Sequence, residues 1–212
     1  MRVAIVEPHY DDAWLNVGGT ILLRPRDEFV IVSVTRGRRM NPVPTTARLE
    51  QILTNVVTRD LALDDPGWDA RRASDQSALA ALARANGLVP ADIASRVAAA
   101  IGTCDRVWLP LGMGHPTHEA VAELVLPWPT ARYVEYPYAY VEAATLERRV
   151  RGRVRRDVDI RAALPRKLSI FEDVYASQRY VLSLFAGQPP LAALEFETLL
   201  ADDVCALSEI AG

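Results

Sequence analysis

Short apolar runs alternate with segments of helical periodicity over most of the chain. A short, nearly all-apolar run predicts a strand buried on both faces, whereas apolar residues three or four apart predict an amphipathic helix. The predicted strands are 2–6, 28–35, 105–109 and 132–136. The predicted helices are 13–23, 47–63, 69–86, 91–101 and 119–126, with a loop over 36–46. Strands that alternate with helices indicate right-handed βαβ units.

This alternation predicts an α/β fold of the Rossmann-like, three-layer kind, with a mainly parallel sheet flanked by helices. The segments 164–185 and 191–210 are also predicted as helices. We therefore expect the C-terminal helices of 161–212 to pack on the core. The whole chain, 1–212, is expected to form a single domain, because its length suits one domain and no repeat or linker divides it.

Composition and charge argue against several kinds of partner and location. A net charge of −3 does not favour nucleic acid. No apolar stretch reaches the roughly 18 residues that a membrane span needs, and Glu7 and Pro8 interrupt the first apolar run too early for a signal peptide. The two cysteines are too few for a disulfide framework. These features predict a cytoplasmic protein with no nucleic-acid or membrane partner.

An arginine-rich run spans residues 148–156. Charge runs are typical of solvated faces or subunit contacts, so a homo-oligomer is compatible with the sequence. The same run could instead gather an anionic substrate.

The three histidines of the chain all follow predicted strands. His9 comes after the first strand together with Asp11 and Asp12, and His115 and His118 come after the strand 105–109. Ligands of open α/β sheets bind at the carboxyl ends of strands. Imidazole and carboxylate suit zinc or another divalent transition metal, and two histidines with one aspartate leave a position open for water. One aspartate can ligate while the other takes a proton, or either can cap the helix that follows.

These residues resemble a known signature. The segment Pro8-His9-Tyr10-Asp11-Asp12-Ala13, followed by Gly18-Gly19-Thr20, resembles the PHPDD…GGT signature of the LmbE-like (PIG-L) zinc-dependent de-N-acetylases, in their PHxDDA branch. Gly114-His115-Pro116-Thr117-His118 is similar to the second motif of that family, HxDH. Weaker similarities to one bacterial branch lie at 71–75, 135–139 and 167–178.

The resemblance implies a hydrolase that removes an N-acyl group, such as acetyl, from an amino sugar or a sugar-containing small molecule. It implies Zn²⁺ as the cofactor, with His9, Asp12 and His118 as the metal ligands. It further implies Asp11 as the general base. His115 is implied as the imidazolium that stabilises the oxyanion, or as an acid.

The chain departs from the family pattern at three positions. Thr117 stands where HxDH has an aspartate that orients the neighbouring histidine, so His115 needs another partner or a lower pKa. Ala13 stands where glutamate is common, a change that the PHxDDA branch shares. Met113 stands where the mycothiol branch has a tyrosine that contacts substrate, which argues against that specificity. No metal ligand is lost.

Four further residues are candidates for substrate contact. Arg71 or Arg72 could reach a sugar hydroxyl or a phosphate, or could lie on the surface and pair with Asp75. Tyr10 could line the site or only shape its loop. Trp14 could stack on a substrate ring, although a core tryptophan is the more common case.

Two other functions fit part of the pattern. Two histidines and one carboxylate also describe the Fe(II) centre of oxygenases. A sugar- or nucleotide-binding protein with weakened catalysis is the other alternative, and Thr117 favours it. A dinucleotide site at Gly18-Gly19 is disfavoured because GxGxxG is missing between the first strand and its helix.

Overall fold

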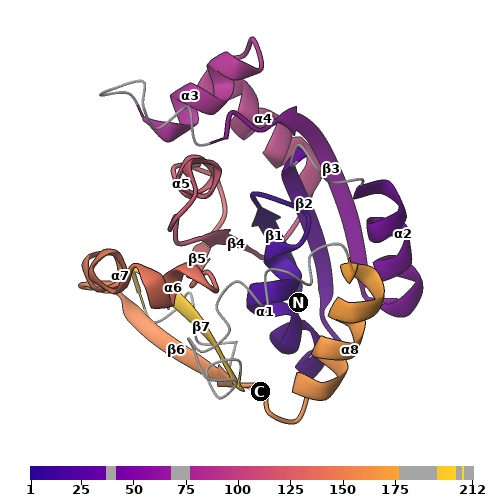
Figure 1. Cartoon of the computed structure of the whole chain (residues 1–212). Helices are drawn as coiled ribbons and strands as arrows, with labels where there is room; N and C mark the ends of the chain where they lie inside the picture. Colours follow the sequence, from indigo (N-terminus) through magenta and orange to yellow (C-terminus); the bar gives the residue numbers. More distant parts are fainter. Residues whose placement is uncertain (37–41, 68–76, 177–194, 204–206, 208–212) are drawn as a thin grey trace.

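In the part of the chain that the structure describes, seven strands form one twisted sheet in the order β3-β2-β1-β4-β5-β7-β6 (Figure 1). The computed structural model describes the chain except for residues 37–41, 68–76, 177–194, 204–206 and 208–212, and describes no side chains for 42–46. The strands are β1 Arg2–Glu7, β2 Glu28–Arg36, β3 Val56–Asp64, β4 Arg106–Pro110, β5 Thr130–Tyr133, β6 Val154–Asp159 and β7 Phe196–Ala201.

The sheet is mainly parallel, as predicted. Strand β1 lies between β2 and β4 and pairs parallel with both. Strands β3 and β5 extend this parallel part on either side. Strand β7 pairs antiparallel with β5 and with β6, so only this edge of the sheet departs from the parallel arrangement.

Helices cover both faces of the sheet (Figure 1). They are α1 Asp12–Leu23, α2 Pro42–Ile52, α3 Ala78–Ala85, α4 Pro90–Ile101, α5 Pro116–Ala122, α6 Tyr138–Val141, α7 Ala143–Val150 and α8 Leu164–Val174. One hydrophobic cluster joins α1, α2 and α8 to one face of the sheet. A second cluster joins α3, α4 and α5 to the other face. The three-layer α/β fold predicted from the sequence is therefore confirmed.

The prediction of one helix over 47–63 is wrong. Helix α2 ends at Ile52, and Val56–Asp64 forms strand β3 beside β2. Asn55 lies at the turn between them, where its side-chain amide donates to the carbonyls of Arg24 and Asp27. The β-branched start of this segment, Val56-Val57-Thr58, favours a strand, and pairing with β2 forms it.

The prediction of a helix over 191–210 is also wrong where the structure describes this segment; residues 191–194, 204–206 and 208–210 lie outside the described residues, as do 177–185 of the predicted helix 164–185. Phe196–Ala201 forms strand β7, whose buried residues alternate at its start before a continuous buried run. Of the helices expected within 161–212, α8 does pack on the core through Ile170 and Phe171. The segment 191–200 is rich in leucine, which favours a helix when the sequence is considered alone. Strand β7 forms because β5 and β6 supply its hydrogen-bond partners.

Strand β6 and helices α6 and α7 were not predicted, and the remaining differences are at element boundaries. The described part of the predicted helix 69–86 is α3, which begins after Ser77, whose side chain accepts from the Ala80 N–H. Helix α5 starts at Pro116, earlier than predicted, because His115 serves as its N-cap. The arginine-rich run divides between the end of α7 and strand β6, where half-buried and exposed positions alternate. In the described part of the chain, no helix has the length and apolar character needed to span a bilayer.

A buried ion pair fixes α1 to the C-terminal part of the fold. The Lys167 ammonium lies 2.7 Å from Glu197 Oε1 and donates to the Leu15 carbonyl at 2.6 Å. Glu197 in turn accepts from the backbone N–H groups of Gly19 and Thr20. The two side chains therefore bond to backbone groups in the middle of α1.

Close packing explains the second glycine of the GGT segment. A Cβ on Gly19 would lie 2.5 Å from Ile160 Cδ1, so any larger residue would displace that side chain. The helix thus tolerates the poor propensity of glycine because α1 must approach the segment that follows β6.

Candidate metal centre

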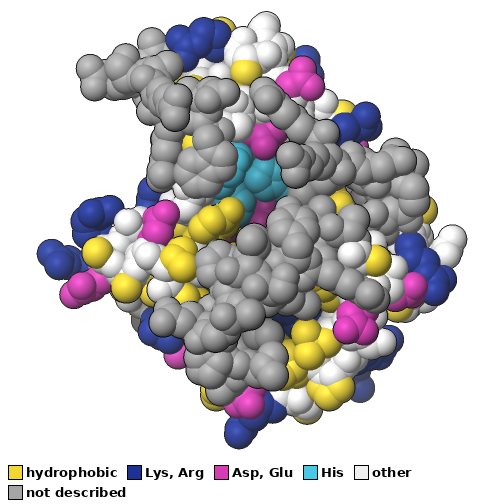
Figure 2. All heavy atoms as spheres, in the orientation of Figure 1, with side chains coloured by type: hydrophobic (Ala, Val, Ile, Leu, Met, Phe, Trp, Pro, Cys, Tyr) yellow, Lys and Arg dark blue, Asp and Glu magenta, His cyan; other side chains and the backbone are white. Residues whose placement is uncertain are grey.

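The histidines gather at the carboxyl ends of β1 and β4. The chain leaves β1 for β2 on one side and returns as β4 on the other, so the loops after these two strands diverge. Such a point in an open α/β sheet is the usual location of a ligand site. Figure 2 shows the histidine side chains as one patch, with acidic side chains against it.

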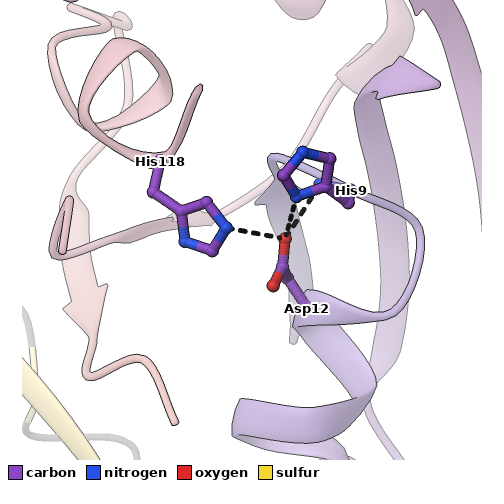
Figure 3. A group of neighbouring side chains, drawn as sticks. All are labelled: His9, Asp12 and His118. Carbon is purple, nitrogen blue, oxygen red and sulfur yellow. Dashed lines mark hydrogen bonds and ion pairs between the residues drawn. The ribbon is translucent and has the colours of Figure 1, made fainter. Parts of the chain in front are cut away.

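Three potential ligand atoms converge here. Asp12 Oδ2 lies 3.2 Å from His9 Nδ1 and 3.4 Å from His118 Nε2. Figure 3 shows the three side chains pointing toward one another from the loop after β1, the start of α1 and helix α5. All three ligand atoms lie within 4.8 Å of one another, which is the spacing that ligands of a single ion require.

Each of these histidines places its other ring nitrogen against a carboxylate. His9 Nε2 lies 3.1 Å from Asp65 Oδ2, and His118 Nδ1 lies 3.1 Å from Glu135 Oε1. Glu135 is fully buried and accepts from the backbone N–H groups of Gly112 and Met113. Carboxylates in this position fix the tautomer of metal-binding histidines and increase their basicity.

The loop after β1 is held by backbone and carboxylate contacts. The buried Glu7 carboxylate accepts from the Ala13 N–H at 2.7 Å and from the Ser33 hydroxyl. The His9 N–H donates to Asp12 Oδ2 at 2.9 Å, which brings that carboxylate back toward the loop. The polypeptide therefore turns His9 and Asp12 to the same side.

The loop after β4 depends on glycine. Gly114 has φ +75°, and a Cβ there would lie 2.0 Å from Tyr138 Cδ1. Only glycine combines this backbone conformation with such a close approach. The residue lets the chain turn from β4 into α5, so that His115 and His118 face the β1 loop.

The electric field of the site favours a cation. Burial alone would lower the pKa of His9, but the bonds to Asp12 and Asp65 outweigh it and raise this pKa to about 10. Burial would raise the pKa of Asp12, yet the neighbouring His118 and His9 hold it below its usual value. Carboxylates that hold a positive charge between them form a donor set suited to a divalent metal ion. The residues present therefore fit a zinc-type ion.

Asp11 is buried beside this group but outside it. It occupies the N-cap position of α1, yet its side chain makes no capping hydrogen bond, so helix capping does not explain it. Burial and the adjacent Asp12 raise the pKa of Asp11 to about 7. A carboxyl group with this property is suited to proton transfer near neutral pH.

His115 lies against His9 and His118. Its ring centroid is 5.1 Å from that of His9 and 5.9 Å from that of His118. Its Nδ1 accepts from the Thr117 N–H at 3.3 Å, which leaves the proton of a neutral ring on Nε2. Burial and the neighbouring His9 lower the pKa of His115 to about 4. The ring is therefore neutral at pH 7 in this arrangement, whereas the resemblance implies an imidazolium or an acid.

Sequence reasoning missed two members of the site, Asp65 and Glu135. Asp65 follows β3, and the segment before it was predicted as a helix, so its place at the carboxyl edge of the sheet was hidden. An acidic pair before Pro66 and Gly67, after an apolar run, was the available signal. Glu135 lies near the end of the predicted strand 132–136. An acidic residue at the carboxyl end of a strand was a signal that Glu135 belongs to the same site as the histidines.

Of the four substrate candidates, two are buried in the core and two lie outside the described residues. Trp14 is fully buried and its indole N–H donates to the Lys167 carbonyl at 3.1 Å. Tyr10 is buried and stacks on Tyr175. Both therefore belong to the core. Arg71 and Arg72 lie outside the described residues.

No protein-family model matches the chain, and no curated protein matches its sequence. Several solved structures share its fold. One is a deacetylase of the teicoplanin biosynthetic pathway, solved in complex with teicoplanin, with 17% identity, a TM-score of 0.59, and coverage of 94% of this chain and 97% of that chain.

The A40926 pseudoaglycone deacetylase Dbv21 matches with 19% identity and a TM-score of 0.57, over 94% of this chain and 96% of that chain. N,N'-diacetylchitobiose deacetylase from Pyrococcus horikoshii matches with 13% identity and a TM-score of 0.54, over 95% of this chain and 84% of that chain. These three deacetylases thus share the fold of this chain. These likenesses confirm the fold that the resemblance in sequence implies.

Proposed function

We propose that this protein is a metal-dependent hydrolase that removes an N-acetyl or similar N-acyl group from an amino sugar or a sugar-containing small molecule. The observation that carries the proposal is the convergence of His9 Nδ1, Asp12 Oδ2 and His118 Nε2, with the Asp11 carboxyl group buried beside them. The similar solved structures are deacetylases, which supports the same chemistry.

His9, Asp12 and His118 would hold the ion, and their donor set suits Zn²⁺. When bound, Zn²⁺ supplies a Lewis acid and lowers the pKa of a coordinated water toward about 7. Asp65 and Glu135 keep the ligand rings oriented, each from the far nitrogen of a histidine.

Asp11 moves the proton. Its carboxylate accepts a proton from the attacking water and delivers it to the amide nitrogen as the carbon–nitrogen bond breaks. The products are a carboxylic acid, which ionises in water by releasing its proton, and a free amine. This role needs a carboxyl group that no ligand or cap engages, and Asp11 makes no capping bond at the start of α1.

His115 supplies a hydrogen bond. With Nδ1 accepting from the Thr117 N–H, its Nε2–H can donate to the carbonyl oxygen of the substrate as negative charge develops there. A neutral imidazole can perform this task, and a donor of this kind is typically worth about 3 kcal/mol.

Asp11 also distinguishes the proposal from the Fe(II) alternative, because a facial triad of two histidines and a carboxylate needs no further base.

A single-domain organisation, a cytoplasmic location and a homo-oligomer stay predictions of the sequence.

The test is acetate release from N-acetylated amino sugars, N,N'-diacetylchitobiose and N-acetylated glycopeptide intermediates, with zinc present. We expect at least one substrate to be hydrolysed. Asp11→Ala should keep its zinc and lose about 10²- to 10⁴-fold in rate, the usual contribution of a general base. Hydrolysis by Asp11→Ala at the wild-type rate would contradict the mechanism.

A further inference from the structure

We propose that Asp65 is a positioning residue of the metal centre, which supplies from the end of β3 the carboxylate that position 117 lacks. This inference rests on the proposed metal-dependent function. Asp65 links a ligand histidine in the β1 loop to the segment that carries His115 and His118. Residue 117 contributes only a hydroxyl group, and that hydroxyl is bonded to Asp65.

Both oxygens of Asp65 are engaged. Oδ2 lies 3.1 Å from His9 Nε2. Oδ1 accepts from the Thr117 hydroxyl at 2.6 Å and from the Gly67 N–H at 2.8 Å. The side chain is only 10% exposed. Three partners from three segments therefore hold the carboxylate in a single orientation.

The contact with His9 decides which ring nitrogen could bind an ion. With Nε2–H directed at the Asp65 carboxylate, a ring that has given up its other proton keeps its lone pair on Nδ1, and it is Nδ1 that lies 3.2 Å from Asp12 Oδ2. A carboxylate behind a ligand histidine fixes the ring and makes it a better ligand. Asp65 would thus orient His9 for metal binding without being a ligand itself.

The contact with Thr117 extends to His115. The Thr117 hydroxyl donates to Asp65, and its backbone N–H donates to His115 Nδ1. In the HxDH motif that this segment resembles, position 117 carries the carboxylate itself. Here the carboxylate comes from β3, and the threonine links it to the same histidine segment. Asp65 therefore supplies the carboxylate that the threonine at position 117 does not.

The alternative is that Asp65 ligates a second ion. Among the described residues, His9, Asp65 and His115 also offer three ligand atoms within 4.8 Å of one another. Such an ion would have to share the His9 ring with the first ion, one on each nitrogen, which requires a ring with no proton. The bond between His9 Nε2 and Asp65 needs no such change, and it favours positioning.

Zinc binding tests the role directly and needs no substrate. We expect the wild type to bind one zinc ion per chain in a chelator-competition titration. Asp65→Asn, which keeps the shape but removes the charge, should weaken zinc binding by about 10- to 100-fold. Asp64→Asn is the matched control, because Asp64 is adjacent in sequence but exposed, and it should bind zinc as the wild type does. Circular dichroism should be the same for all variants.

A swap of the carboxylate separates positioning from a general loss of structure. Thr117→Asp alone places two carboxylates at hydrogen-bonding distance, so it should weaken zinc binding. In the Asp65→Asn background, the same Thr117→Asp change should restore most of the lost affinity. Thr117→Asp is thus expected to weaken zinc binding in the wild type and to strengthen it in the Asp65→Asn variant. Two independent structural defects would not produce this change of sign.

Three results would overturn the inference. One is Asp65→Asn binding zinc as tightly as the wild type. Another is two zinc ions in the wild type and one in Asp65→Asn, which would make Asp65 a ligand. The third is a double variant no better than Asp65→Asn. A wild type that binds no zinc at all would instead refute the proposed function, and the inference with it.

Discussion

Helix α1 touches two buried polar clusters that differ in one respect. In its middle, Lys167 and Glu197 form an ion pair whose hydrogen bonds reach the backbone of the helix. At its N-terminal end, Asp12 faces His9 and His118. The first cluster contains its own cation. In the second, lone pairs of three side chains converge, and the positive charge must come from protons or from a metal ion.

This difference distinguishes a cluster with a structural role from a cluster that is suited to bind a metal ion. A buried charge is tolerated when it is paired and hydrogen-bonded, and the ion pair meets that condition within the protein. The histidine–aspartate cluster meets it only when a cation is present. Removing one member of each cluster should therefore change different properties: metal binding at the end of the helix and stability in its middle.

The largest effect is expected from His118→Ala. The variant removes one of three ligands, so its zinc affinity should fall by more than the roughly 10- to 100-fold that follows loss of an orienting group, and acetate release should fall with it. Zinc at 1,000 times its Kd should stabilise the wild type by about 4 kcal/mol but not this variant. Thermal unfolding and metal analysis measure both effects.

His115→Ala is the matched control for that experiment. Because His115 is assigned a contact to substrate and no contact to the ion, this variant should keep its zinc. A His118→Ala protein that retains stoichiometric zinc would remove the distinction between the two clusters.

A smaller effect on function and a clear effect on stability are expected from Lys167→Met. The substitution leaves the Glu197 charge buried without its partner, which typically costs about 3–5 kcal/mol. Urea unfolding should detect the loss, while the zinc affinity of the folded protein should stay unchanged.

Arg166→Met is the control for Lys167→Met, since Arg166 is adjacent but exposed and should shift stability by no more than about 0.5 kcal/mol. Replacing both partners, as Lys167→Met with Glu197→Gln, should recover part of the stability. Zinc loss in the folded Lys167→Met protein would show that the clusters are coupled.

The smallest effect is expected from Gly19→Ala. The added Cβ would meet Ile160 at 2.5 Å, and overpacking typically costs about 1–3 kcal/mol, against a gain in helix propensity of up to about 1 kcal/mol. We expect a net loss of about 1 kcal/mol in the free energy of unfolding. Adding Ile160→Val, which removes Cδ1, should recover part of it, and a Gly19→Ala protein as stable as the wild type would contradict the packing argument.

Local pattern predicted the elements that carry the candidate ligands. Strands β1, β2 and β4 are short apolar runs that end at a polar motif, and this signal depends on nothing distant in the chain. The same is true of His9, Asp12 and His118, which the resemblance implies as ligands and which the structure brings together. Strands β3 and β7 lie in segments that were predicted as helices, because a short segment can take its conformation from the strand that pairs with it.

The sequence by itself therefore determined the α/β class and placed all three histidines at strand ends. Tertiary structure alone decided which carboxylates complete the site. Asp65 is 56 residues from His9, and Glu135 is 17 residues from His118. The physical reason is that hydrogen bonds to a ligand histidine depend on distances of about 3 Å, which only the order of strands in the sheet establishes.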